Sequence, residues 1–385
     1  MPDFAALLRG DARLDSRVEI TLLCPISGDR ISLTERQAVF IARLSAQQWS
    51  EVASLAAGDC LTEEEIAGLA ERGALVCDAE TPWAMRLREG ESRLAAVGWH
   101  PQAALYHAST QWRAVAGDEG HRDHDDVAHC GRLGAHAAAH GKLPPHFHHR
   151  DDASTRYVLP AVAFDDPFAQ VLRARRTTRH FDTGSTLSLA DFTRVLYGTF
   201  GVMGTEELAP DVVALKRTSA SGGALHPVEA YPLVIKVEGL EPGFYHYEGS
   251  SHCLALLEAM TQVQARELAA VLTIGQTYFA EAHALVFHVA RLDRHHWKYR
   301  RHPKAYKAVL LDSGHLSQTF YLLAAEHGLG AFYTAAINDA DVASRLKLDP
   351  LSEIVIGANG VGVADPLRDQ LHLRPEPYDP APLAP

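Results

Sequence analysis

The stretch of residues 304–327 constrains the fold most, because its pattern predicts one long helix. Apolar side chains such as Leu316 and Phe320 recur around most of its circumference, so we expect the helix to be buried at the centre of a domain. Gly328 and Gly330 follow it directly and predict its end. A buried helix needs other elements around it, so the main domain must be built on this segment.

Three apolar runs, at residues 231–237, 284–290 and 353–358, predict strands that pack with this helix. The segments between them carry mainly helical patterns. The mixture predicts an α+β fold in which helices flank a central, mainly antiparallel sheet. This module covers about residues 165–375, and the proline-rich end at 375–385 predicts an extended tail.

A smaller α/β module is expected at about residues 17–78. Residues 18–23 and 31–33 alternate as strands do, and a helix is expected to begin at Thr34. Thr62 precedes a second helix with Glu65 three residues on, the spacing of a capping box. A short strand is expected at residues 74–76. The order is typical of a winged-helix-like module.

Charge narrows the range of partners. Lys and Arg number 36 against 48 Asp and Glu, so the formal net charge is −12, which argues against nucleic acid or an anionic membrane as a partner. Three consecutive glutamates at 63–65 would repel DNA, so peptide or protein docking is expected of the first module. Five scattered cysteines, no signal peptide and no membrane-spanning run indicate a cytoplasmic protein.

The segment between the modules is rich in histidine. Two of these residues, His136 and His140, have the i, i+4 spacing of helical metal ligands, but no zinc-finger or H-E-x-x-H pattern accompanies them. We therefore expect a solvated linker and no metal. Eight of the 22 histidines fall here: His121, His124, His129, His136, His140, His146, His148 and His149. The predicted domains are residues 1–100, a linker at 101–160, and 161–385.

Four short segments of the second module carry polar or basic groups suited to chemistry. Residues 173–179 hold four arginines and two threonines, a combination that binds anions such as phosphate. Residues 219–229 are rich in Ser and Gly before a strand, which lets a flat ligand approach the backbone. Lys298 and Tyr299 can form a proton-transfer pair. Polar groups at 312–318 interrupt the apolar helix and need partners.

In this order the segments resemble a known family. Five motifs are similar to those of the nitroreductase-like flavoprotein superfamily. They read R-R-T-T-R-x-F, S-x-S-G-G-A-L-H-P-x-E-x-Y, K-Y, L-D-S-G-H-x-x-Q and L-G-A-F. Within it, they resemble the SagB-type branch, the peptide-maturation dehydrogenases that oxidise azolines to azoles. The resemblance covers about residues 165–375. His226 stands where such relatives usually carry an aromatic residue.

The resemblance implies a homodimer with FMN in a cleft at the dimer interface. Arg175, Thr177 and Arg179 are expected to hold the phosphate and ribityl chain, with Arg368 or Arg374 as a further phosphate ligand. The implied cofactor site as a whole comprises Arg175, Arg176, Thr177, Arg179, Ser219, Ser221, Gly222, Gly223, Thr334, Ala335, Ala336 and Arg368. Lys298 and Tyr299 match the Lys-Tyr pair that removes a proton in azole-forming relatives.

The function expected from this resemblance is oxidation of azoline rings in a ribosomally made, modified peptide, with FMN as cofactor. The expected partners are a second copy of the chain, the modified precursor peptide and a cyclodehydratase. Two alternatives remain open. One is a flavin-dependent reductase that uses NAD(P)H on a dehydroamino acid, enone or nitro group. The other is a peptide-binding scaffold without catalysis.

Overall fold

The computed structural model describes residues 20–45, 48–58, 61–117, 126–145, 147, 150, 152, 154–160 and 162–368, and of residues 126–130 it describes only the backbone. The expected proline-rich tail and Arg374 lie outside these ranges. The chain divides into two compact units. The first is Met1–Gln111 with Arg300–Pro303, and the second is Trp112–Tyr299 with Lys304–Pro385.

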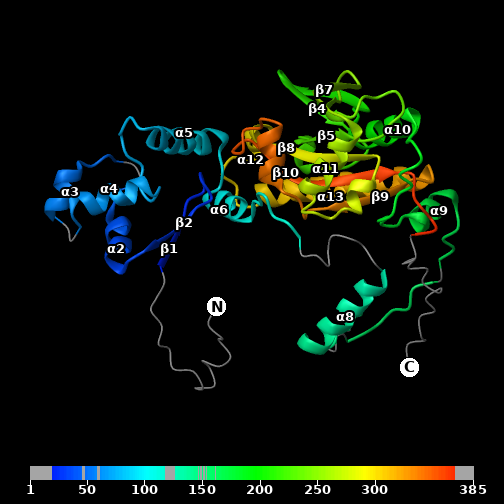
Figure 1. Ribbon diagram of the computed structural model, residues 1–385, viewed down its shortest axis with the longest axis horizontal. Coiled ribbons are helices and arrows are strands. Elements are labelled where there is room, and N and C mark those ends of the chain that lie inside the picture. The colour runs from blue at the N-terminus through cyan, green and yellow to red at the C-terminus, as the bar shows by residue number, and fades with distance from the viewer. Residues whose placement is uncertain are drawn as a thin grey trace. The chain divides into compact units, whose positions relative to one another are not determined.

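A six-stranded sheet forms the centre of the second unit, in the order β7-β6-β5-β8-β10-β9 (Figure 1). All its neighbouring strands run antiparallel, which confirms the predicted sheet. The three strands expected from the sequence, β5, β8 and β10, lie side by side at its centre, while β6 and β7 were not anticipated. The strands are β5 (Val228–Val234), β6 (Gly243–Glu248), β7 (Cys253–Ala259), β8 (Ala284–Arg291), β9 (Gly330–Thr334) and β10 (Glu353–Gly362).

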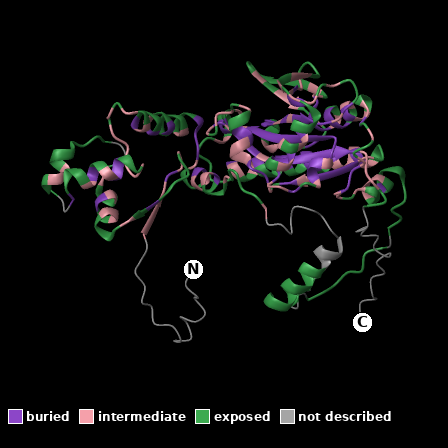
Figure 2. Ribbon diagram, viewed as in Figure 1, coloured by how far each residue is buried: buried purple, intermediate pink, exposed green. Residues whose placement is uncertain are grey.

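Helices cover both faces of this sheet, as predicted for an α+β fold. Phe287 of β8 belongs to the core that the sheet forms with α11 (Gln262–Leu272) and α14 (Asp339–Arg345). The next residue, His288, points to the opposite face, where it contacts α13 (Ala305–Glu326) and α10 (Leu189–Phe200). Side chains alternate across a strand, so one strand serves both layers. Figure 2 shows the sheet as a buried band between exposed helical surfaces.

The second unit has further elements besides these central layers. An exposed hairpin, β3 with β4, stands apart from the main sheet and pairs only within itself among the described strands. These elements are α8 (Asp126–His140), α9 (Pro167–Ala174), β3 (Gly204–Ala209), β4 (Val212–Lys216), η1 (Gly222–Ala224), η2 (Phe279–Glu281) and α12 (Leu292–Tyr299).

The long predicted helix is α13, and Gly328 follows its end with a left-handed φ of 67°. The expectation that it is buried around most of its circumference is wrong on one side. The sheet and α10 cover part of the helix, and Leu311 on the uncovered side is 54% exposed. The outer stripe of α13 consists of Lys307, Leu310, Leu311, Gly314, His315 and Gln318.

The first unit contains two short strands and several helices, as expected of a small winged-helix-like module. The capping box predicted at Thr62 with Glu65 is present, and the helix expected to begin at Thr34 does so with a second capping box, formed with Gln37. The strand expected at 74–76 does not form, because Ala74 and Leu75 pack against the core around Phe40 instead of pairing. The elements are β1 (Ile20–Leu23), β2 (Arg30–Leu33), α2 (Glu35–Arg43), α3 (Val52–Gly58), α4 (Glu63–Glu71), α5 (Pro82–Val97) and α6 (Pro101–Thr110).

The histidine-rich segment expected to be a linker contains a helix, α8, whose described side chains are exposed. The rings of His136 and His140 lie 4.5 Å apart, centre to centre. Within the described ranges, three or more His, Cys, Asp or Glu side chains never gather as metal ligands would. His121, His124, His146, His148 and His149 lie outside the description, as do the side chains of His129 and Cys130. The same ranges contain no helix long and apolar enough to cross a bilayer.

Candidate functional site

Asp312 fixes the turn formed by Ser221, Gly222 and Gly223, which we call the glycine turn. Its carboxylate accepts the Ser221 hydroxyl at 2.5 Å and the Gly222 backbone N–H at 3.0 Å. The Ser221 hydroxyl in turn accepts the His226 backbone N–H at 2.9 Å. Asp312 is buried on α13, so these charge-assisted bonds are protected from water. The polar groups noted at 312–318 therefore include the anchor of the Ser- and Gly-rich segment.

Lys298 and Tyr299, at the end of α12, lie against this turn. Gly223 has a left-handed φ of 65°, and a Cβ there would lie 2.7 Å from the Tyr299 hydroxyl and 3.0 Å from Lys298 Nζ. Glycine is thus needed both for its conformation and for the close approach of the two side chains. The structure brings the predicted proton-transfer pair to the segment predicted to pack at the cofactor.

Further contacts tie the same segment to α13. The hydroxyls of Ser219 and Thr319 are 2.6 Å apart, and His315 Nδ1 lies 3.1 Å from the Ala220 carbonyl oxygen. Asp312 and Thr319 are seven residues apart, about two helical turns, and so share one side of α13. Residues 219–223 therefore run along that side of the helix.

The predicted anion-binding residues, Arg175, Arg176, Thr177 and Arg179, gather elsewhere, and we call them the arginine cluster. The Arg175 guanidinium lies 5.5 Å from the centre of the Tyr321 ring, and Thr177 Oγ1 lies 3.2 Å from the Tyr321 hydroxyl. Tyr321 is nine residues beyond Asp312, about two and a half turns, and so points from the opposite side of α13. Within one chain the arginine cluster and the glycine turn are not brought together.

Thr334, Ala335 and Ala336 belong with the arginine cluster. The Thr178 backbone N–H donates to the Ala331 carbonyl at 2.7 Å, which attaches the cluster to β9, and Thr334 is the last residue of that strand. The Thr334 hydroxyl accepts the Ala336 backbone N–H at 3.0 Å. The predicted cofactor residues thus form two groups on opposite flanks of the outer stripe of α13.

Arg368 is engaged by carboxylates. Its guanidinium pairs with Glu281 at 2.5 Å and with Asp365 at 2.9 Å, and donates to the Phe181 carbonyl at 3.0 Å. A phosphate would have to displace these partners, so we leave Arg368 out of the proposed site. Arg374, the alternative ligand, is not among the described residues.

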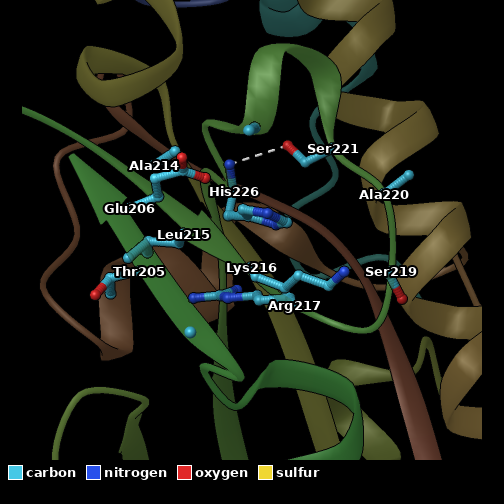
Figure 3. A pocket seen from close by; sticks show the side chains of 12 residues that line it. Thr205, Glu206, Ala214, Leu215, Lys216, Arg217, Ser219, Ala220, Ser221 and His226 are labelled. Carbon is cyan, nitrogen blue, oxygen red and sulfur yellow. Dashed lines mark hydrogen bonds between the residues drawn. The ribbon is translucent and has the colours of Figure 1, made fainter. Parts of the chain in front are cut away.

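A pocket of about 490 Å³ opens beside the glycine turn (Figure 3). The β3–β4 hairpin forms one wall and residues 219–226 form the other, with His226 in the middle and Lys216 and Arg217 crossing below it. Burial, followed by the charge of Arg217, lowers the pKa of His226, so this ring is neutral at pH 7. Neither the hairpin nor Arg217 was picked out from the sequence.

Glu229, in the same motif as the glycine turn, has a structural role. Its carboxylate lies 2.9 Å from His246 Nε2 and 3.2 Å from Arg291 Nη1. Burial alone would raise the pKa of Glu229, but the hydrogen bonds and charges of His246 and Arg291 hold it below its ordinary value. The paired carboxylate stays ionised and joins β5, β6 and β8.

Sequence reasoning missed several neighbours of these groups. His295 on α12, Tyr321 on α13 and Arg217 after β4 all contact or flank residues of the two groups. For His295 the helical spacing offered a signal, since it precedes Tyr299 by one turn.

Comparison with known proteins gives the chain its family. Residues 172–363 match the model of the nitroreductase family. The trifolitoxin-processing protein TfxB of Rhizobium leguminosarum bv. trifolii is 29% identical over 222 residues, which are 56% of this chain and 58% of that protein. The microcin B17-processing protein McbC of Escherichia coli is 28% identical over 44% of this chain and 60% of that protein.

A third relative is MJ1384 of Methanocaldococcus jannaschii, a nitroreductase by name, which is 29% identical over 46% of this chain and 83% of its own length. The chain thus spans less than two thirds of TfxB and McbC.

The fold has a solved counterpart. A chain in the structure of the E. coli microcin synthetase McbBCD complex with truncated pro-MccB17 bound superposes with a TM-score of 0.50, at 19% identity, over 71% of this chain and 94% of that one. At that identity the superposition establishes the fold alone. The matched residues, 172–363, lie almost entirely in the second unit, so this chain contains a domain of the nitroreductase family.

Proposed function

We propose that this protein is an FMN-dependent dehydrogenase that oxidises azoline rings to azoles in a ribosomally made, modified peptide. The observation that carries the proposal is the contact of Lys298 and Tyr299 with the glycine turn, where a Cβ on Gly223 would lie 2.7 Å from the Tyr299 hydroxyl. Two relatives, TfxB and McbC, are named as peptide-processing proteins, which supports a peptide substrate.

The residues present suit FMN. Arg175 and Arg179 supply guanidinium groups and Thr177 a hydroxyl for a phosphate. Gly222 and Gly223 bring their backbone directly against His295, Lys298 and Tyr299, so a flat ring that reaches the glycine turn lies close to the proposed base. FMN supplies a two-electron acceptor when bound. The arginine cluster and the glycine turn flank the outer stripe of α13, so we infer that one FMN lies between the cluster of one protomer and the turn of its partner.

The chain's own contribution is proton removal and orientation. Oxidation of an azoline removes two hydrogens, one of them as a proton from the acidic carbon next to the peptide carbonyl. Tyr299 is the proposed acceptor of that proton, and Lys298 stabilises the negative charge that develops. Asp312 fixes the glycine turn, so Tyr299 would keep a constant position relative to a substrate bound there.

The first unit is proposed to dock the peptide. Its two-stranded sheet, β1 with β2, leaves strand edges to which an extended segment can add by backbone hydrogen bonds. A cyclodehydratase that forms the azoline is the proposed enzyme partner, because this reaction must supply the substrate.

The test is a synthetic peptide with one thiazoline ring, incubated with FMN-loaded protein in air. Mass spectrometry should show the loss of two hydrogens per ring, and azole absorbance should rise. No change in mass, with FMN bound and dioxygen present, would reject azoline oxidation.

A reductase is the second candidate, favoured by the match to MJ1384. It predicts rapid bleaching of the flavin by NADPH or NADH under nitrogen, followed by turnover of a nitro, enone or dehydroamino acid substrate. In a dehydrogenase that uses dioxygen, the flavin should instead be bleached under nitrogen by the azoline peptide. A scaffold without catalysis would remain colourless even after added FMN.

Arg175→Ala should weaken FMN binding by about 10- to 100-fold, since hydrogen bonds to charged groups contribute about 1.5–3 kcal/mol. The flavin-to-protein absorbance ratio after dialysis measures this. Arg173→Ala is the matched control, because Arg173 lies 5.7 Å from the Phe164 ring instead. Full occupancy of the Arg175 variant would discredit the phosphate assignment.

Mixing the Arg175→Ala and Tyr299→Phe proteins tests the shared site. Each mixed dimer would hold one site with both residues intact, so statistical exchange should restore about a quarter of wild-type activity. Activity no higher than the sum of the two variants would place the arginine cluster and Tyr299 in the same protomer's site.

The outer stripe of α13 is the proposed dimer interface. Leu310 and Leu311 are exposed on it, and Gly314 lets another backbone approach. Leu311→Glu would bury two unpaired carboxylates per dimer, and should weaken association by about 10²-fold or more.

Light scattering across a dilution series should therefore find monomers of the Leu311 variant where the wild type is dimeric. Val263→Glu is the control, because Val263 is 66% exposed near the start of α11, far from α13 in sequence. A dimeric Leu311→Glu protein would mean that this stripe is not the interface.

A further inference from the structure

His295 lies beneath the glycine turn with its ring completely buried, at 0% exposure. It precedes Tyr299 by one turn of α12, and the two ring centres are 5.0 Å apart. A Cβ on Gly222 would lie 3.9 Å from His295 Cε1, as a Cβ on Gly223 would lie 2.7 Å from the Tyr299 hydroxyl. The imidazole thus lies under the glycine turn, next to the proposed base.

Packing does not account for a histidine at this position. Among the described residues, neither ring nitrogen of His295 makes a hydrogen bond of good geometry, although both are shielded from solvent and the backbone of Ala305 lies close enough to interact with the ring. Each unsatisfied buried polar atom costs about 1–3 kcal/mol, and native proteins retain few of them. A phenylalanine ring would occupy a similar volume without this cost. The polar ring is therefore retained for something other than the core.

Of the charged groups around His295, the Asp312 carboxylate favours a protonated imidazole ring. Asp312 approaches from α13, where a Cβ on Gly222 would lie 4.0 Å from its Oδ1. Helix α12 itself contributes Lys298, Tyr299 and the ring of His296, whose centre is 5.9 Å away. The glycine turn contributes no titratable group, and His226 beyond it is neutral. Burial lowers the pKa of His295, while the Asp312 carboxylate and the backbone of Ala305 oppose that shift, so the resting ring is neutral but has a counter-ion nearby.

We propose that His295 is a positioning residue that accepts the hydroxyl proton of Tyr299, so that Tyr299 can act as the base. This rests on the proposed azoline oxidation and deepens it. The proton leaves the Tyr299 oxygen for a ring nitrogen of His295, and Asp312 stabilises the imidazolium. The Tyr299 phenolate then takes the proton from the substrate carbon and becomes a phenol again. His295 later releases its proton to solvent, so each turnover delivers one proton to water.

Other enzymes use the same kind of arrangement, in which an acid–base residue activates its neighbour and is itself supported by a third group. Here His295 would activate Tyr299, and Asp312 would support His295. A small rotation or one bridging water would be needed to join the Tyr299 hydroxyl to the His295 ring, and catalytic hydrogen bonds often tighten only when substrate is bound. Asp312 would therefore serve two purposes, holding the glycine turn and supporting a charge on His295.

The kinetic test compares wild type with His295→Gln on the synthetic thiazoline peptide. Glutamine cannot take up a proton, so kcat should fall by about 10- to 100-fold with little change in KM. The rate should recover as pH rises, because hydroxide can then ionise Tyr299 directly. His296→Gln, a buried neighbour on the same helix, should keep the wild-type pH profile. A His295 variant with wild-type kcat and pH profile would overturn the proton role.

Two measurements do not need activity. In substrate-free protein, the NMR titration midpoint of His295 should fall further in Asp312→Asn, because the supporting carboxylate is gone. His295→Phe should unfold at the same or a higher urea concentration than wild type, since it removes two unsatisfied nitrogens. An unchanged midpoint, or strong destabilisation by phenylalanine, would contradict the inference. If the wild-type protein does not oxidise the thiazoline peptide, the proposed function is wrong. If it does, but the His295 variants behave as wild type, only the proton role of His295 is wrong.

Discussion

Tyr299→Phe is expected to lower kcat for azoline oxidation by about 10²-fold or more, the usual cost of removing a general base. The flavin should stay bound, because the phenyl ring still packs beside the glycine turn. Steady-state kinetics on the thiazoline peptide, with the flavin absorbance ratio recorded in parallel, measures both effects. Lys298→Ala should act in the same direction, and Lys298→Arg should retain more activity because it keeps the positive charge.

The control for Tyr299 is Tyr197→Phe, since Tyr197 lies on α10 beside His252 rather than at the glycine turn. It should leave kcat unchanged. Turnover at the wild-type rate in Tyr299→Phe would remove this residue from the mechanism and, with it, the proton role of His295. Loss of flavin in that variant would instead mean that Tyr299 helps to shape the cofactor site.

His288→Asn is expected to change how folding stability depends on pH. His288 lies on β8 under α13, with Nδ1 2.8 Å from the Ser313 hydroxyl, and burial lowers its pKa to about 4. A lowered folded pKa means that the native state excludes a proton that the unfolded chain accepts below about pH 6.5. Stability is thus fully present above that pH and is lost as pH falls toward 4, by about 3 kcal/mol.

The asparagine variant should be less stable than wild type at pH 8, and the difference should shrink or reverse by pH 4.5. Urea unfolding at several pH values measures it. A difference that stays constant with pH would show that the native state does not exclude a proton from His288.

Asp339→Asn provides a control of opposite sign. Burial raises the pKa of Asp339 to about 6, although the backbone N–H groups of Trp112 and Ala340 donate to it at 2.6 and 2.9 Å. A raised carboxyl pKa contributes stability below about pH 4 that is lost as pH rises toward 6. The stability of Asp339→Asn relative to wild type should therefore increase as pH rises, whereas that of His288→Asn should increase as pH falls. If the stability difference from wild type changed with pH in the same direction for both variants, the effect would come from substituting a buried residue and not from the titration of His288 or Asp339.

Much of the fold could be read from local pattern. The helix starts at Thr34 and Thr62, the long helix α13 and the three central strands all depend on residues a few positions apart. Such signals are short-range, so a sequence displays them directly. Strand β7 was missed because it is largely exposed and its apolar residues do not alternate with polar ones. The strand expected at residues 74–76 failed for the opposite reason, since its apolar residues found a core without pairing.

The candidate site was only partly readable. The motifs identified Lys298, Tyr299, Gly223 and the arginine cluster as separate segments, and a resemblance joined them. That Lys298 and Tyr299 contact the turn at Gly223, while Arg175 lies across α13 from it, depends on how distant segments pack. Arg368 illustrates the limit, because its basic side chain fitted an anion site until its pairing with Glu281 and Asp365 was seen.

By itself the sequence determined which helices and central strands form and which residues have suitable chemistry, since periodicity, capping and side-chain type are properties of neighbouring residues. Only the tertiary structure decided that Asp312 would hold Ser221 and Gly222, that His295 would be buried beside Tyr299, and that Leu311 would face solvent. The physical reason is that burial and hydrogen bonding between segments some ninety residues apart follow from the packing of the sheet and α13, which no local pattern encodes.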